Sequence, residues 1–161
     1  QMQADSGQVV WGLTTNRSYF PTDNSKYFQG DEASLVDWLR PFSKEKDESF
    51  LRGFLGKMLF SGSDALKKPS VLSGGEKARC MYSKMMLSGA NVILLDGPTN
   101  HLDIESISAV NEGLKKFKGS VIFTSHDHEL IQTVANRIIE IDGTVVFDDH
   151  ITYEEYLAKK S

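Results

Sequence analysis

The chain has 161 residues, of which 40% are hydrophobic, 25% charged and 10% aromatic. This composition is that of a globular domain with a sizeable core, and it excludes a disordered, collagen-like or disulfide-rich protein. The formal net charge of −4 argues against nucleic-acid binding by bulk electrostatics, so we expect no direct contact with DNA. The sequence has no apolar run of about 18 residues, no secretory signal and only one cysteine, and we therefore expect a cytoplasmic protein with no transmembrane segment.

The first part of the chain is rich in glycine and polar residues and predicts only short strands. Residues 9–11 and 18–20 have the apolar pattern of strands. Apolar residues then recur at three- and four-residue spacing over residues 34–60, which predicts two amphipathic helices. Ser34 is the expected N-cap of the first helix, and Pro41 is expected to end it.

From residue 70 onward the sequence alternates between helical and strand patterns. The predicted helices cover residues 74–87, 104–118, 127–136 and 153–159, and the predicted strands cover residues 92–96, 121–124, 137–141 and 144–147. The strands at 92–96 and 121–124 are apolar on both faces, which is typical of a mainly parallel sheet covered by helices on both sides. The sequence therefore predicts an α/β fold with a small helical insert over residues 34–70.

Four residues, Ser73-Gly74-Gly75-Glu76, open one of the predicted helices and form a candidate phosphate site. The glycines let an anion approach the backbone N–H groups, and the serine hydroxyl and the positive end of the helix dipole add to the attraction. A plain N-cap with a glycine-rich turn is the structural alternative.

Two further polar residues follow predicted strands. Asp96 ends the strand at 92–96, and His126 comes directly after the strand at 121–124. The carboxyl ends of parallel strands form the ligand-binding edge of open α/β sheets. Asp96 is therefore a candidate Mg²⁺ ligand, and His126 is a candidate partner of a γ-phosphate or an attacking water. A helix cap for the aspartate and a polar loop residue for the histidine are the alternatives.

In this order and at these spacings, the motifs resemble those of the ATP-binding-cassette (ABC) ATPases. Residues 73–76 resemble the signature motif, 92–96 the Walker B strand, 100–103 the D-loop, and His126 the switch histidine. The resemblance implies a partial P-loop NTPase cassette that uses ATP and Mg²⁺. The nucleotide-binding residues that it implies are Ser73, Gly74, Gly75, Glu76, Asp103 and Thr22, and the catalytic positions are Asp96, which is also the metal ligand, His126 and Gly97.

Further segments resemble the ABC-F class, and they lie at residues 60–62, 76–79, 98–103 and 153–157. The resemblance implies the second, C-terminal cassette of a ribosome-acting protein of the translation-factor or antibiotic-resistance type. Its implied partners are an opposing ABC cassette and the ribosome. The implied organisation has N-terminal strands and a Q-loop region at 1–30, a helical subdomain with the signature motif at 31–90, and the Walker B, D-loop and switch-histidine part of the catalytic core at 91–161.

Three departures from the family pattern limit this expectation. The P-loop pattern G-x-x-x-x-G-K-[ST] is missing, so we expect a fragment that by itself binds ATP weakly or not at all. Gly97 stands where the family has a glutamate that activates water, a loss that typically costs about 10²–10⁴-fold in rate and predicts retention of the nucleotide. Thr22 stands where the family has the Q-loop glutamine. Whether the chain itself is an enzyme therefore stays open.

Two other functions are compatible with the sequence. One is the nucleotide-binding subunit of an ABC transporter, which would couple to a membrane partner through the helical insert. The other is a stable but inert half-domain. In the family sheet the P-loop strand lies beside the strand at 121–124, so a chain without it should expose that edge and self-associate.

Overall fold

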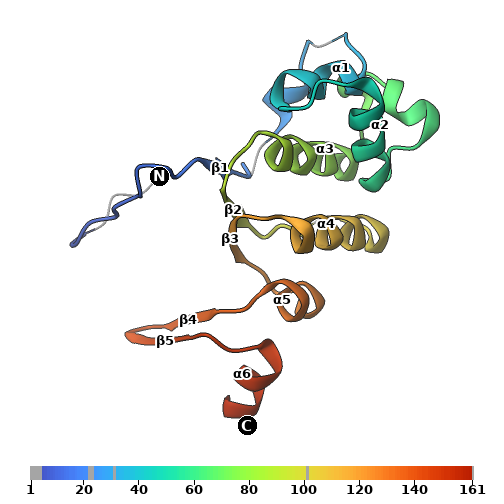
Figure 1. Ribbon diagram of the computed structural model, residues 1–161. Coiled ribbons are helices and arrows are strands. Elements are labelled where there is room, and N and C mark those ends of the chain that lie inside the picture. Colours follow the sequence, from blue (N-terminus) through green and yellow to red (C-terminus); the bar gives the residue numbers. More distant parts are fainter. Residues whose placement is uncertain (1–4, 22–23, 31, 101, 161) are drawn as a thin grey trace.

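Three short parallel strands form the sheet on which the remaining elements are arranged (Figure 1). The computed structural model describes residues 5–21, 24–30, 32–100 and 102–160. Across the sheet the order is β1 (Arg17–Tyr19), β2 (Val92–Asp96) and β3 (Ser120–Thr124). The central position of β2 follows from its sequence, because it is the most continuously apolar of the three.

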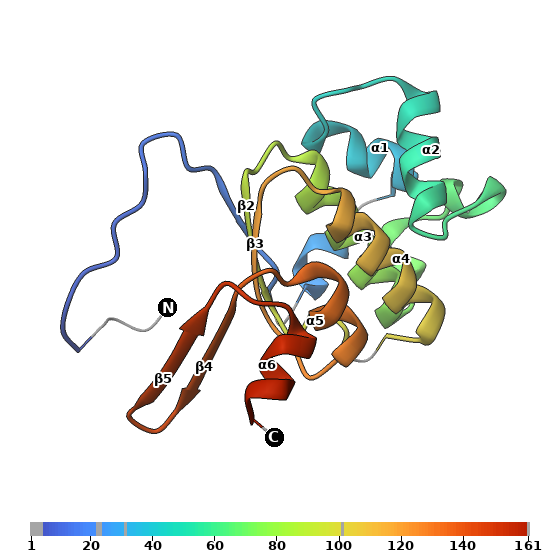
Figure 2. The ribbon, with the colours of Figure 1, turned by 60° about the horizontal axis from the view of Figure 1, so that its bottom comes forward.

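Three helices cover one face of this sheet, as both ribbon views show (Figures 1 and 2). They are α3 (Gly74–Leu87), α4 (Ile104–Lys116) and α5 (His128–Val134). Ile93 and Leu95 of β2 are buried in the core that these helices supply. Burial of large apolar side chains stabilises by about 1.5–3 kcal/mol each, so this contact fixes the position of β2 and of the residues that follow it.

The helical insert has its own group of buried side chains. It consists of α1 (Leu35–Leu39), α2 (Glu48–Lys57) and the short 3-10 turns η1 (Ser25–Phe28), η2 (Arg40–Phe42), η3 (Gly62–Leu66) and η4 (Pro69–Val71). As predicted, Ser34 caps α1 by accepting a hydrogen bond from the backbone N–H of Asp37 at 3.2 Å. Leu51 and Leu55 of α2 share a buried cluster with Cys80 of α3, so α3 belongs to the packing of both the insert and the sheet.

An antiparallel hairpin and a last helix follow α5. The hairpin pairs β4 (Ile138–Asp142) with β5 (Val145–Asp149), and α6 (Tyr153–Lys160) follows it. Tyr153 packs edge-on against His128 of α5, with ring centroids 5.3 Å apart. None of the helices in the described part of the chain combines the length and the apolar character needed to span a bilayer.

The α/β fold with a mainly parallel sheet is confirmed, but two local predictions are wrong. Residues 9–11 form no strand, and Val9 and Val10 are exposed. Trp11 instead stacks against the guanidinium group of Arg17, at 4.5 Å from the ring centroid. In the described residues, helices cover one face of the sheet and not both, so Ile122 of β3 is 57% exposed where a buried strand was expected.

The outer edge of β3 is the expected weak point of this arrangement. Among the described residues β3 pairs with β2 alone. Its sequence, Ser-Val-Ile-Phe-Thr, contains no lysine or proline that would oppose pairing with another strand. Tyr19, Leu94 and Ile122 lie in one row across the open face, so an apolar surface adjoins the edge.

We predict that the chain self-associates through β3 and that Ile122→Lys weakens this association. A lysine at the edge would place a charge where a second strand must approach. In sedimentation velocity, the weight-average sedimentation coefficient of the unmodified chain should rise with concentration. That of the variant should stay closer to the value of the monomer. Ile104→Lys is the matched control, because Ile104 is 86% exposed and lies on α4. A chain that is monomeric at every concentration would contradict the prediction.

Candidate nucleotide-binding site

The start of α3 is a complete helix cap that faces solvent. The Ser73 hydroxyl accepts a hydrogen bond from the backbone N–H of Glu76 at 3.3 Å, and the Glu76 carboxylate accepts one from the backbone N–H of Ser73 at 2.8 Å. Ser73 and Gly74 are exposed, and Gly75 is half-buried. All four residues that the sequence singled out here therefore lie together, with backbone N–H groups at the positive end of a helix of 14 residues.

A small charge network surrounds this helix start. The Lys67 ammonium lies 3.1 Å from the carboxylate of Glu76 and 2.9 Å from that of Asp64. The hydrogen bond from the Ser73 backbone, with Lys67 adding to it, lowers the pKa of Glu76 below its usual value. Glu76 is therefore ionised at neutral pH, and Lys67 offsets the negative charge that it brings to the anion-attracting end of α3.

A second group of residues lies where β2 and β3 end. The hydroxyl of Thr124 donates a hydrogen bond to Oδ1 of Asp96 at 2.7 Å. The backbone N–H of Gly97 donates to the carbonyl oxygen of Thr124 at 3.1 Å, which ties the two strand ends together. His126 is exposed two residues beyond Thr124. Asp96, Gly97 and His126 thus share one edge of the sheet, as predicted, and Thr124 is a member of this group that the sequence reading missed.

Gly97 adopts a backbone conformation that a glutamate tolerates poorly. Its φ is +57°, in the left-handed region, and its carbonyl oxygen accepts a hydrogen bond from the backbone N–H of Asn100 at 3.1 Å. A Cβ atom added to Gly97 would overlap the side-chain amide of Asn100. A side chain at this position would therefore meet both an unfavourable backbone conformation and a steric overlap.

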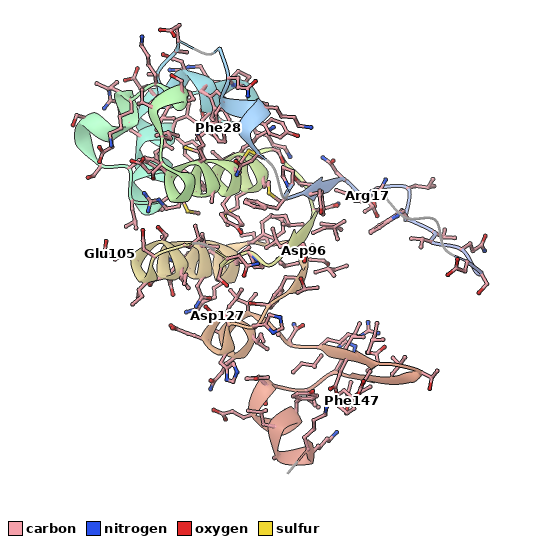
Figure 3. All side chains as sticks on the ribbon, turned by 180° about the vertical axis from the view of Figure 1, so that it is seen from behind. Arg17, Phe28, Asp96, Glu105, Asp127 and Phe147 are labelled. Atoms are coloured by element: carbon pink, nitrogen blue, oxygen red, sulfur yellow. The ribbon has the colours of Figure 1, made fainter. Side chains whose placement is uncertain are left out.

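Asp103 caps α4 and lies with the start of α3, away from Asp96. Its carboxylate accepts a hydrogen bond from the backbone N–H of Ser106 at 2.7 Å, and this bond lowers the pKa of Asp103. A Cβ on Gly75 would lie 4.0 Å from a methyl group of Leu102, so the two helix starts are neighbours. Figure 3 shows Glu105, in the first turn of α4, at the end of that helix far from the sheet, whereas Asp96 lies in the sheet at the end of β2.

The predicted site residues therefore form two groups. One is the helix-start group of Ser73, Gly74, Gly75, Glu76 and Asp103, and the other is the strand-end group of Asp96, Gly97 and His126. Thr22 lies outside the described residues. No cluster of three or more His, Cys, Asp or Glu side chains able to hold a metal ion occurs in the part of the chain that the structure describes. A single carboxylate such as Asp96 suits Mg²⁺ that is bound mainly through nucleotide phosphates and water.

No protein-family model matches the chain. Among curated proteins, the chain is 61% identical over 158 residues to the uncharacterized ABC transporter ATP-binding protein YkpA of Bacillus subtilis, covering 98% of the chain and 29% of the relative. It is 38% identical over 153 residues to ABC transporter F family member 2 of Arabidopsis thaliana, and the match covers 95% of the chain and 23% of that relative. It is 33% identical over 165 residues to the energy-dependent translational throttle protein EttA of Escherichia coli K12, and the match covers 97% of the chain and 29% of that relative. The chain thus spans less than a third of the length of each of these relatives.

Two solved structures resemble the fold. The complex of an archaeal ribosomal stalk protein, aP1, with the ribosome recycling factor aABCE1 matches with a TM-score of 0.70 and 25% identity, covering 96% of this chain and 32% of that one. A dimeric post-hydrolysis state of an ATP-binding cassette bound to ADP and Pi matches with a TM-score of 0.62 and 19% identity, covering 83% of this chain and 63% of that one.

The depressed pKa of Glu76 generates a pH-dependent prediction. The ionised Glu76 should stabilise the fold above its unfolded pKa of about 4.3, and this contribution should be lost as the pH falls through the lower folded pKa. At pH 7 Glu76→Gln should lower the free energy of unfolding by about 0.3–1 kcal/mol, as expected for a charge at a helix N-terminus. Urea unfolding at pH 7 and pH 3 measures the difference, which should be smaller at pH 3. Glu105→Gln, in the first turn of α4, is the control for the general dipole effect.

The left-handed turn at Gly97 gives a second prediction. Gly97→Ala should lower the free energy of unfolding by about 1–2 kcal/mol, the cost of that conformation for a residue with a Cβ, plus the strain from overlap with Asn100. When the double variant with Asn100→Gly is compared with the Asn100→Gly single variant, the part due to overlap should disappear and the conformational part should remain. Urea unfolding of the three variants measures both parts. An alanine at position 97 that leaves stability unchanged would show that this turn is not under the constraint described.

Proposed function

The chain has the fold of an ABC cassette, and its homologues are ABC ATP-binding proteins that include F family members; from this premise we propose that it is part of the second cassette of a two-cassette ABC-F protein. That protein would couple ATP binding and hydrolysis to closure of its cassettes on the ribosome. The observation that carries the proposal is the separation of the helix-start group from the strand-end group.

The separation suits a nucleotide held between two cassettes. Ser73 and Gly75, at the exposed start of α3, would bind the γ-phosphate of ATP held by the opposing cassette. Asp103, which lies beside this helix start, would link the two sites across the interface. A dimeric cassette among the similar folds supports such a pairing.

The strand-end group would serve the nucleotide of this cassette. Asp96 would hold Mg²⁺, which neutralises phosphate charge, and His126 would contact the γ-phosphate. Thr124 orients the Asp96 carboxylate by donating a hydrogen bond to it. Thr22, by position in the sequence, would contact Mg²⁺-bound water.

The departures from the family pattern would weaken ATP binding and ATP hydrolysis by this cassette. The sequence contains no P-loop to cradle a triphosphate, so the chain alone would bind ATP weakly. With Gly97 and the Asn100 amide at the catalytic position, the site has no carboxylate there to deprotonate water. ATPase activity would then depend on other parts of the full-length protein, and bound nucleotide would be retained.

One relative and one similar fold support a role on the ribosome. EttA is a translational throttle protein by name, and the archaeal neighbour is a ribosome recycling factor crystallised with a ribosomal stalk protein. We accordingly propose a cytoplasmic protein whose RNA contact lies outside this acidic chain, without direct DNA binding. We also propose the division of the chain at residues 30 and 90 described from the sequence. A transporter function is less well supported, because the relatives include an F family member and a translational throttle protein.

Co-sedimentation of the full-length protein with ribosomes tests the proposal. The protein should pellet with ribosomes in the presence of ATP and less so with ADP, because ATP closes the two cassettes. Ser73→Arg should abolish the ATP dependence, since a large side chain at the start of α3 blocks approach of the phosphate.

Ser88→Arg is the matched control, because Ser88 is exposed at the opposite end of α3 and should leave the ATP dependence intact. Failure of the unmodified protein to bind ribosomes with ATP, together with binding to a membrane partner, would favour the transporter function. Intact ATP-driven closure in the Ser73→Arg protein would contradict the proposed role of the helix start.

A further inference from the structure

A buried tyrosine connects α3 to the segment between β2 and α4. The Tyr82 hydroxyl donates a hydrogen bond to the carbonyl oxygen of Pro98 at 2.6 Å, and Tyr82 is 1% exposed. Its ring stacks on that of Phe20, with centroids 4.7 Å apart and planes inclined by 18°. The tyrosine thus has one orientation in the core, and its hydroxyl reaches the residue next to Gly97.

A buried arginine makes a second connection, one turn closer to the start of α3. Arg79 is 9% exposed, its guanidinium donates a hydrogen bond to the hydroxyl of Ser106, and it lies 5.1 Å from the ring centroid of Phe60. Nε of Arg79 has no hydrogen-bond partner among the described residues. The backbone N–H of Ser106 donates to Asp103, so this contact attaches α3 to the capped start of α4.

Both connections are costly to break because they are buried. Removing the Tyr82 hydroxyl would leave the Pro98 carbonyl without its partner in a buried setting, and losing Ser106 would leave a buried guanidinium with fewer bonds. From Tyr82 to Ser73 the helix has no proline, and its glycines lie in the first turn. Between these two residues α3 is thus a continuous helix with no break in its sequence.

We propose that Tyr82 is a positioning residue which, together with Arg79, couples the segment that follows Asp96 to the start of α3. Ser73 and Tyr82 lie about 13 Å apart along the axis of α3, taking the rise per residue of an α-helix. The functional meaning of this coupling rests on the function proposed above. In that function, a change at the nucleotide bound by this cassette would alter the start of α3, which contributes to the nucleotide site of the opposing cassette. The link itself depends only on the hydrogen bonds of this chain.

Amide hydrogen exchange measured by NMR on the chain without nucleotide tests the link. The amides of Asn100 and Leu102 donate to the carbonyl oxygens of Gly97 and Thr99, at 3.1 and 3.2 Å, and report on the segment. Tyr82→Phe should speed their exchange by about tenfold, the effect of one lost buried hydrogen bond. Tyr19→Phe is the matched control, because Tyr19 lies 53% exposed on the open face, and it should leave these rates unchanged.

Coupling requires a second perturbation. Asn100→Ala removes the side-chain amide that lies against Gly97, and it should change exchange at Glu76 and Lys77, whose amides bond to Ser73. In the Tyr82→Phe background the same substitution should no longer affect these two amides. A purely structural role for Tyr82 would leave the effect of Asn100→Ala equal in both backgrounds, and that result would overturn the proposal.

Ser106→Ala provides an independent test should Tyr82→Phe unfold the chain. It removes the acceptor of the Arg79 guanidinium and should also reduce the response of Glu76 and Lys77 to Asn100→Ala. An undiminished response in this variant would likewise overturn the proposal. Because neither ATP nor ribosomes are used, the result is separate from the outcome of the co-sedimentation experiment.

Discussion

Burial of one face of β2 against three helices is the contact on which the structure depends. Ile93 and Leu95 point into the helical layer, and Asp96 follows them at the end of the strand. The position of this carboxylate is therefore set by the core, and no loop has to be ordered to hold it. Pairing of β2 with β3 then brings Thr124 beside Asp96 through the strand register.

The middle and the start of α3 lie in different surroundings. Its middle, at Cys80 and Tyr82, is buried in the insert and in the core beneath the sheet. Its start, at Ser73, faces solvent with a complete cap. A well-packed middle fixes the direction of an exposed end, and that is the requirement for a helix start that has to meet a ligand presented by another domain.

Local features of the sequence predicted the elements and caps well. Ser34 and Ser73 were recognised because a cap and the helix that it begins are adjacent in sequence. The hydrogen bonds of Tyr82 and Thr124, in contrast, join residues 16 and 28 positions apart, and no pattern within one helix or strand signals them. The left-handed turn at Gly97 could have been suspected from the glycine itself, but its clash with Asn100 depends on how the turn folds. The strand predicted at residues 9–11 failed for a related reason, since a strand needs a partner and none is present among the described residues.

The turn at Gly97 also bears on the chemistry proposed for the strand-end group. A general base must carry a carboxylate or imidazole within reach of the attacking water, and a glycine next to Asp96 supplies neither. A glutamate at this position would adopt the left-handed conformation at a cost of about 1–2 kcal/mol, and the Asn100 amide would have to move away. Because Asn100 belongs to the segment that Tyr82 holds through Pro98, such a change would strain the connection to α3. In the function proposed above, the missing carboxylate at Gly97 and the hydrogen bond from Tyr82 to Pro98 therefore concern the same short segment, and the hydrogen bond is what connects that segment to α3.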